Sequence, residues 1–129
     1  MIKKITILVF ILHSIFAYAQ KTKISNPFDT FLSGVYSHDT DKLISSFSED
    51  AIVIDVGRKI VGKKEIQKWA KSEIIDAGLV YKILSQNSKK ENLQEYIIHI
   101  SSKSFTFKAR YLIQTENEKI IKAVLEYAD

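Results

Sequence analysis

The sequence predicts an α+β fold in which three helices precede a mostly antiparallel, curved sheet and pack on one side of it. Before Gly78, apolar residues recur at helical spacing in three segments, with one strand-like run between the second and the third. Beyond Gly78, apolar and polar residues alternate, as in strands with one buried face. The 129 residues, 46% hydrophobic and 26% charged, suffice for one domain with a packed core.

The first helix is expected to begin at Asn26-Pro27. Asn26 can accept a hydrogen bond from a free amide of the first turn, and Pro27 occupies a position that needs no donor. One apolar stripe follows at helical spacing: Phe28, Phe31, Leu32, Val35 and Tyr36. Asp39 can cap a second, short helix. The buried side of that helix is expected to consist of Leu43, Ile44 and Phe47.

A strand is expected over Ala51–Val56, where β-branched residues concentrate, and Gly57 ends it. The third helix precedes Gly78 and presents one apolar face: Ile66, Trp69, Ala70 and Ile74. Four strands are expected after it, over 79–85, 96–101, 104–114 and 119–127, with polar turns at 87–92 and 115–118.

Alternation assigns faces to the last two strands. The inward face is expected to carry Phe105, Phe107, Ala109, Tyr111 and Ile113 on one strand and Ile121, Ala123, Leu125 and Tyr127 on the other. The opposite, outer face then retains an apolar patch of Leu112, Ile120 and Val124. A second subunit covering that patch would explain it, so we expect a homodimer.

The first twenty residues read as a secretory signal peptide. Two lysines precede the apolar run Ile5–Leu12, and Ala17-Tyr18-Ala19 supplies small residues for cleavage. A membrane anchor is the alternative, but the apolar run is shorter than the ~20 residues of a spanning helix. We therefore expect residues 1–20 to be removed, leaving a periplasmic or secreted domain of residues 21–129 with no membrane association.

Composition excludes several function classes. The chain has no cysteine, which excludes disulfides, thiolate metal sites and thiol nucleophiles. His38 and His99 share no metal-binding spacing, and no phosphate loop or dinucleotide fingerprint occurs, so neither a metal nor a cofactor is expected. The net charge of +4 falls to +2 on signal removal, when 17 basic residues remain against 15 acidic ones. No aromatic residue interleaves with the helical lysines Lys64, Lys68 and Lys71 on the same helix face, so nucleic-acid binding is not expected. These lysines are interpreted as a solvated helix face or, alternatively, as a surface for an acidic partner.

Several segments together resemble one known family. They are Ser37-His38-Asp39-Thr40-Asp41, Phe47-Ser48-Glu49-Asp50-Ala51, Asp55-Val56-Gly57 and Gly62-Lys63-Lys64-Glu65-Ile66-Gln67-Lys68-Trp69. With the element order of residues 21–129, they resemble the SnoaL-like branch of the nuclear transport factor 2-like (NTF2-like) superfamily. The resemblance implies a cone-shaped sheet around an internal pocket, usually in a homodimer joined through sheet surfaces. Members include steroid isomerases, polyketide cyclases, dehydratases and epoxide hydrolases, besides many proteins without detected chemistry.

The resemblance to ketosteroid isomerases places Asp55 at their general-base position. A carboxylate in an apolar cavity loses hydration, which favours proton transfer near neutral pH. The alternative is a structural role, in which Asp55 accepts a backbone hydrogen bond in a turn. His99 would join Asp55 as a dyad if its strand turned that face inward. The isomerases' oxyanion donors correspond to Phe31 and to Ala109 or Arg110, so a steroid-isomerase mechanism is not expected.

Three functions follow as hypotheses. The first is an exported protein whose pocket takes a small, largely apolar ligand, with Tyr and Trp tips inside it. The pocket residues are expected to be Phe31, Tyr36, Trp69, Phe107, Tyr111, Leu125 and Tyr127, although core packing explains the aromatic ones equally well. The second is a lyase, isomerase or hydrolase that uses Asp55 as general base. The third is a non-catalytic protein-interaction module whose cone is filled by its own side chains.

Overall fold

The computed structural model describes residues 26–129, and the expected signal peptide lies outside them. The helices are α2 (Pro27–Ser37), α3 (Thr40–Ser45) and α4 (Lys63–Ala70), which continues into the π-helical turn η1 (Lys71–Ile75). The strands are β1 (Phe47–Asp55), β2 (Arg58–Val61), β3 (Val80–Lys90), β4 (Leu93–Ser101), β5 (Thr106–Glu116) and β6 (Lys119–Tyr127). None of the described helices has the length and apolarity that a membrane span requires.

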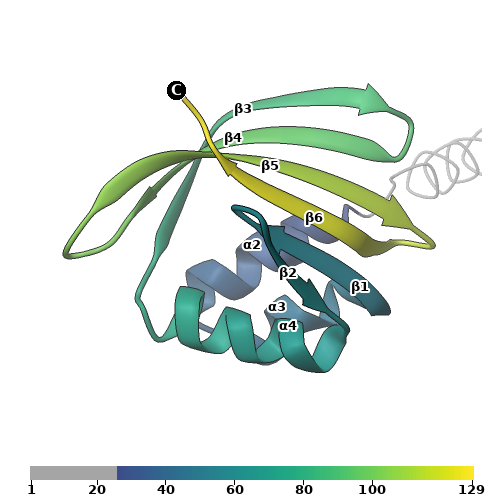
Figure 1. Ribbon diagram of the computed structural model, residues 1–129, viewed down its shortest axis with the longest axis horizontal. Coiled ribbons are helices and arrows are strands. Elements are labelled where there is room, and N and C mark those ends of the chain that lie inside the picture. Colours follow the sequence, from purple (N-terminus) through teal and green to yellow (C-terminus); the bar gives the residue numbers. More distant parts are fainter. Residues whose placement is uncertain (1–25) are drawn as a thin grey trace, which may run out of the picture.

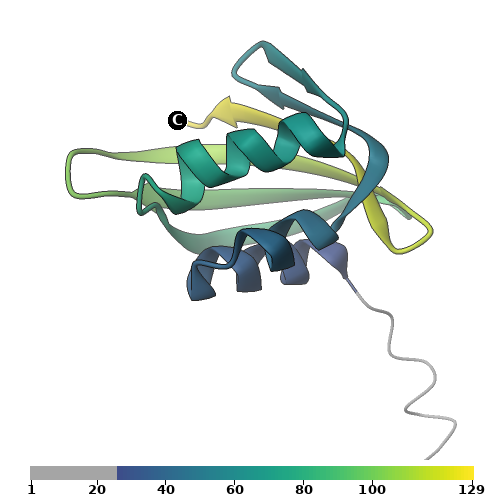
Figure 2. The same cartoon turned by 90° about the horizontal axis from the view of Figure 1, so that it is seen from below.

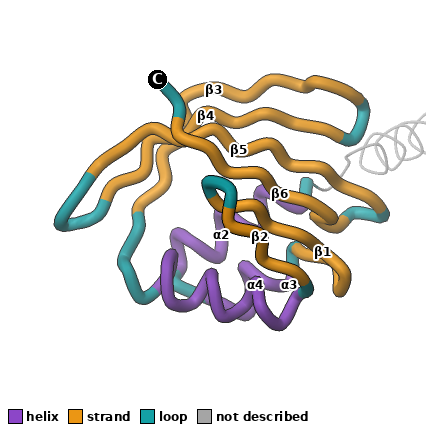
Figure 3. The backbone as a smooth tube through the Cα atoms, in the orientation of Figure 1, coloured by secondary structure: helices purple, strands orange, loops and turns teal. Residues whose placement is uncertain are grey.

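The six strands form one sheet in the order β2-β1-β6-β5-β4-β3, in which only the β1–β6 pair is parallel. The sheet curls, so that β3 to β6 arch over the helices while β1 and β2 bend toward them (Figure 1, Figure 3). Seen from the helix side, α2, α3 and α4 all lie across the same face of the sheet (Figure 2). The expected α+β class, with three helices on a curved, mostly antiparallel sheet, is confirmed.

Both expected helix caps are present. The Asn26 side chain accepts a hydrogen bond from the Phe28 amide at 3.0 Å, and the Asp39 side chain accepts one from the Lys42 amide at 3.0 Å. Phe47, expected on the second helix, instead begins β1. Its side chain is still buried, because it faces the same core.

Aromatic rings fill the cone at the end covered by α2. Phe28 lies with its ring centroid 4.3 Å from that of Tyr96 and 5.1 Å from that of Phe31. Phe31 in turn contacts the rings of Phe47 and Tyr111. All five side chains are at most 2% exposed. We call this the closed end of the cone.

The outer face of β6 differs from the expectation at Ile120, which is fully buried. The β5–β6 pairing shifts register between Gln114 and Thr115, so one extra residue, Ile121, stands between two paired positions of β6. That irregularity turns Ile120 inward, and the expected patch loses this member. Val124 and Leu112 do lie side by side on the outer face, half-buried, and Ile54 of β1 pairs beside Val124.

The first hairpin and the turn after β3 also differ from the expectation. Lys59-Ile60-Val61 belongs to a short strand, β2, which pairs with β1 and forms one edge of the sheet. β3 runs to Lys90, so its turn is shorter than the expected 87–92. The end of β3 is exposed along the other edge, where polar residues are compatible with a strand.

Candidate functional site

The opposite, open end of the cone contains a hollow of about 450 Å³. Five segments contribute to it: β1, η1, the connection to β3, the start of β5 with its preceding turn, and β6. The lining residues are Asp55, Glu73, Leu79, Phe105, Thr106, Phe107, Leu125 and Tyr127.

The sheet register brings the strand residues of this hollow together. Asp55 is the last residue of β1 and pairs with Leu125 on β6, which pairs in turn with Tyr111 on β5. These three residues form one row across the inner face, because residues directly opposite in a sheet point to the same side. The row runs from the hollow at Asp55 into the core at Tyr111, which is fully buried.

Three aromatic rings form a rim around the hollow, here called the aromatic rim. The Phe105 and Phe107 rings stack with centroids 5.7 Å apart, and Tyr127 packs edge-on against Phe107 at 5.5 Å. Phe105 is 50% exposed and Tyr127 is 66% exposed. These three rings therefore give the border of the hollow an exposed aromatic surface.

A charged cluster closes one side of the hollow. Asp55 Oδ2 accepts hydrogen bonds from Trp69 Nε1 at 3.0 Å and from Arg58 Nη2 at 2.7 Å. Arg58 Nη2 also donates to both carboxylate oxygens of Glu73, at 2.7 and 2.8 Å. The hydrogen bonds that Arg58 donates to Glu73, and secondly to Asp55, raise the pKa of Arg58 above its ordinary value. Within residues 26–129, Asp55 Oδ1 accepts no hydrogen bond.

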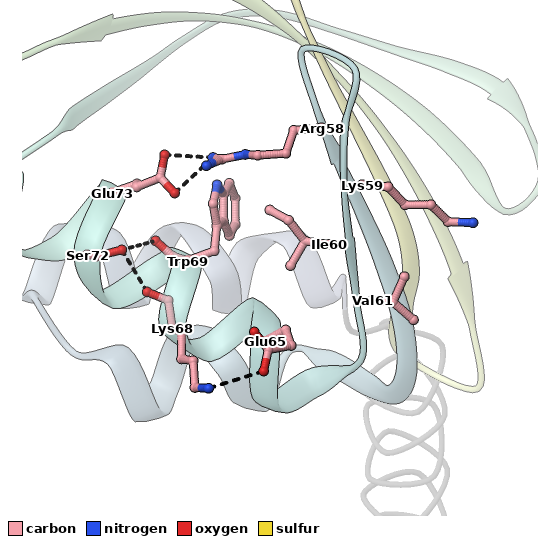
Figure 4. A pocket seen from close by; sticks show the side chains of 9 residues that line it. All are labelled: Arg58, Lys59, Ile60, Val61, Glu65, Lys68, Trp69, Ser72 and Glu73. Carbon is pink, nitrogen blue, oxygen red and sulfur yellow. Dashed lines mark hydrogen bonds and ion pairs between the residues drawn. The ribbon is translucent and has the colours of Figure 1, made fainter.

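A second hollow of about 330 Å³ lies between β2 and α4, on the other side of this cluster. Figure 4 shows Arg58 reaching from β2 toward Glu73, with the Trp69 ring beside them. Lys59, Lys68 and Glu65 also line this second hollow. The Arg58 side chain lines the second hollow but not the first, whereas Glu73 lines both.

A pair of buried tyrosines lies deeper in the core. The hydroxyls of Tyr81 and Tyr111 are 2.5 Å apart, and both side chains are almost fully buried. Burial raises the pKa of both hydroxyls, and the negative charge of Asp55 raises it further. Alternation over Leu79, Tyr81 and Ile83 is the sequence signal for an inward Tyr81, and the expected pocket did not include it.

Three of the seven expected pocket residues line the hollow: Phe107, Leu125 and Tyr127. Trp69 lines the second hollow and reaches Asp55 through its indole nitrogen.

The other three lie elsewhere. Phe31 and Tyr111 are buried in the aromatic core, and Tyr36 is 55% exposed near the end of α2. Five residues of the site were not among the site residues expected from the sequence: Arg58, Glu73, Leu79, Phe105 and Thr106.

The structure does not bring His99 to Asp55. His99 lies between the inward residues Ile98 and Ile100 and therefore points to the outer face. There its Nε2 lies 2.7 Å from Thr106 Oγ1.

The structure also shows where the remaining residues of the expected site lie. The Asp55 side chain bonds to Trp69 and Arg58 rather than to the backbone of the turn that follows it. Ala109 faces the core and Arg110 faces outward beside Glu95 and Glu126, so that position of β5 offers no inward donor. Across residues 26–129, no group of three or more His, Cys, Asp or Glu is arranged to hold a metal ion.

Solved structures of the same fold are numerous, although no family model and no curated protein matches the sequence. A Sinorhizobium meliloti protein assigned to the polyketide cyclases superposes with a TM-score of 0.71 at 19% identity, covering 78% of this chain and 93% of that one. An NTF2-like protein of unknown function from Cytophaga hutchinsonii gives 0.70 at 12% identity, covering 83% and 94%. A Mycobacterium tuberculosis protein solved in complex with estradiol-17beta-hemisuccinate gives 0.71 at 14% identity, covering 79% and 91%.

These similarities run over nearly the whole of each matched structure. Sequence identities this low indicate a shared fold but not a shared chemistry. They agree with the helix order, the sheet order and the curl described above. The chain therefore has the NTF2-like cone fold.

Proposed function

We propose that this protein binds a small, largely apolar ligand in the hollow at the open end of the cone. The observation that carries the proposal is the aromatic rim, whose rings Phe105, Phe107 and Tyr127 border a hollow of about 450 Å³. That volume lies in the range of ~300–1,000 Å³ typical of small-molecule sites. A steroid ester bound to a protein of the same fold supports a flat, apolar body for the ligand.

The polar end of the ligand has a defined place in this proposal. Asp55 and Glu73 are the charged groups that line the hollow, and Asp55 Oδ1 is available as an acceptor. A ligand whose apolar part rests on the rim can donate a hydrogen bond to Asp55. The interaction-module hypothesis fits less well, because the core fills the closed end while the open end keeps its hollow.

Trp69 provides the experiment, because it is the only tryptophan of the chain and its indole is bonded to Asp55. We expect 17β-estradiol, a neutral and flat probe, to change the tryptophan fluorescence in a saturable way. Phe105→Ala and Tyr127→Ala should each weaken binding roughly tenfold, as truncation of an aromatic anchor does. Leu84→Ala is the matched control, because Leu84 is 49% exposed and lines neither hollow. A saturable signal that the rim variants leave unchanged would place binding elsewhere and contradict the proposal.

Proton transfer by Asp55 is the second candidate, favoured by the free oxygen that this carboxylate keeps at the hollow. A ketone such as 5-androstene-3,17-dione, incubated with the protein in heavy water, should then take up deuterium. Asp55→Asn should abolish the uptake while leaving the folded state intact. Equal uptake by the variant would exclude Asp55 as the base. With Phe31 in the core and Ala109 without a donor, we expect any such reaction to be slow.

The proposed site belongs to an exported homodimer. Expression of the full chain in a bacterial host should yield a product whose N-terminus, read by mass spectrometry, begins after Ala19 or Gln20. The outer patch of Ile54, Leu112 and Val124 is the proposed subunit contact. Light scattering at micromolar concentration should give a dimer mass and, for Leu112→Glu, a monomer mass. A monomeric wild type would contradict the proposed contact.

A further inference from the structure

We infer that the ligand of the open-end hollow carries a positive charge, as an amine or quaternary ammonium group attached to its apolar body. The inference rests on the proposed function, because it concerns the ligand of the same site. It follows from two independent properties of the hollow, its charge and its aromatic rings.

The charge of the hollow is negative. Two carboxylates line it, Asp55 and Glu73, and no Lys, Arg or His is among its lining residues. Arg58 pairs with both carboxylates from the side of the second hollow and cancels only one of their two charges. An anionic ligand would therefore meet repulsion without a cation to receive it, whereas a cationic one would restore neutrality.

The aromatic rim suits the same ligand. A cation is attracted to the face of an aromatic ring, and groups of rings bind quaternary ammonium ions in this way. Phe105 and Tyr127 leave half or more of their surface open, and Phe107 lies between them with centroid distances of 5.7 and 5.5 Å. The three rings are thus close enough to contact one small cation together.

The hydrogen-bonding groups of the hollow also favour a cationic ligand over an anionic one. Both oxygens of Glu73 accept from Arg58, and the Thr106 hydroxyl is within hydrogen-bond distance of His99 and of the Ile100 carbonyl. Within the part of the chain that the structure describes, Asp55 Oδ1 is the lining carboxylate oxygen that accepts no other hydrogen bond, and the uncharged Tyr127 hydroxyl is the one lining side-chain group left to donate to a ligand anion. A protonated amine would donate to Asp55 while its carbon neighbours contact the rim.

The test compares two probes of nearly the same shape, (3-hydroxyphenyl)trimethylammonium and the neutral 3-tert-butylphenol. Binding is followed through the single indole N–H signal of Trp69 in a ¹H–¹⁵N correlation spectrum. We expect the cation to bind roughly tenfold more tightly, the order of magnitude of a partly desolvated cation–π contact with an added charge. Benzoate, the anionic probe, should not shift the signal.

Two variants and a control complete the test. Glu73→Gln removes one negative charge from the hollow and should weaken the cation about tenfold while leaving the neutral probe unchanged. Phe107→Leu should weaken the cation more than the neutral probe, because it removes a ring but keeps an apolar side chain. Glu65→Gln, which lies on the second hollow, should change neither.

The outcomes separate this inference from the proposed function. Equal or tighter binding of 3-tert-butylphenol would overturn the inference and leave the apolar-ligand proposal standing. Failure of both probes and of 17β-estradiol to shift the signal would overturn both. Cation binding that Glu73→Gln leaves unchanged would overturn the inference, because the charge of the hollow would then play no part.

Discussion

Aromatic residues occupy both ends of the cone in opposite circumstances. At the closed end, Phe28 and Phe31 of α2 and Tyr111 of β5 are at most 1% exposed. At the open end, Phe105 is 50% exposed and Tyr127 is 66% exposed. Rings of one chemical kind are therefore part of the core at one end and border an exposed hollow at the other.

This comparison shows that alternation along a strand predicts on which face of the sheet a side chain lies, but not how deeply the side chain is buried. Phe105, Phe107, Tyr111 and Tyr127 were all expected on the inner face. Tyr111 is fully buried, Phe107 is partly buried against the core, and Phe105 and Tyr127 are at least half exposed. Stability and ligand binding should accordingly depend on different ends of the molecule, and the following predictions test that separation.

The largest expected effect is at the closed end. Phe31→Ala should lower the free energy of unfolding by about 3–5 kcal/mol, because it leaves a cavity among four aromatic neighbours. Phe105→Ala, the matched change at the open end, should cost less than about 0.5 kcal/mol, because its ring is already half in water. Urea denaturation of the two variants measures both values. Similar losses would show that the two ends are not separate.

Gly34→Ala should lower the free energy of unfolding of the protein by about 1–3 kcal/mol through overpacking. A Cβ at this position would lie 2.6 Å from the backbone nitrogen of Leu43, so α2 and α3 would have to move apart. The better helix propensity of alanine offsets only about 1 kcal/mol of that cost. Thermal unfolding should show a lower midpoint than wild type. An unchanged or higher midpoint would mean that α2 and α3 can move apart to accommodate the methyl group without loss of stability.

The buried tyrosine pair predicts a loss of stability at alkaline pH. Burial holds the pKa of Tyr81 and Tyr111 above the ordinary value near 10 in the folded state. Their neutral forms therefore stabilise the fold below pH ~10, and this contribution is lost as the pH rises, by about 1.4 kcal/mol per pH unit for each hydroxyl. The double variant Tyr81→Phe/Tyr111→Phe should lose stability less steeply between pH 10 and 11 than wild type does, as measured by urea denaturation. Parallel slopes would contradict the assignment.

The smallest effect is expected at the turn between β1 and β2, beside Asp55. Val56 has φ of 48° and Gly57 has φ of 85°, a pair of positive angles that favours Asn-Gly and strains a β-branched residue. Val56→Asn should therefore stabilise the protein by about 0.5–1 kcal/mol, since the valine side chain is 53% exposed and buries little. Denaturant unfolding measures the gain, and a loss would show that Val56 makes contacts that the strain argument neglects.

Local chemistry in the sequence accounts for the parts of the structure that short segments control. Asn26 and Asp39 cap α2 and α3 as expected, because a cap needs only the amides of its own first turn. The buried face of α4 and η1, with Ile66, Trp69 and Ile74, follows from spacing alone.

Interactions between segments far apart in the sequence could not be predicted from local sequence patterns. A single extra residue in β6 turned Ile120 into the core, and alternation has no signal for such an irregularity. The contact of Arg58 with Asp55 and Glu73 joins β1, β2 and η1, and the π-helical turn that carries Glu73 leaves no pattern in the sequence.

Local sequence patterns were enough to predict the helices, most of the strands, the two helix caps and the inner face of most strands, because each depends on residues a few positions apart. The short strand β2 was not predicted. The three-dimensional structure was needed to show which aromatic residues are core and which form the rim, because their burial depends on contacts between segments far apart in the sequence. It also decided that Asp55 meets Arg58 and Trp69 rather than His99, because the curl of the sheet and the face of each strand set those neighbours.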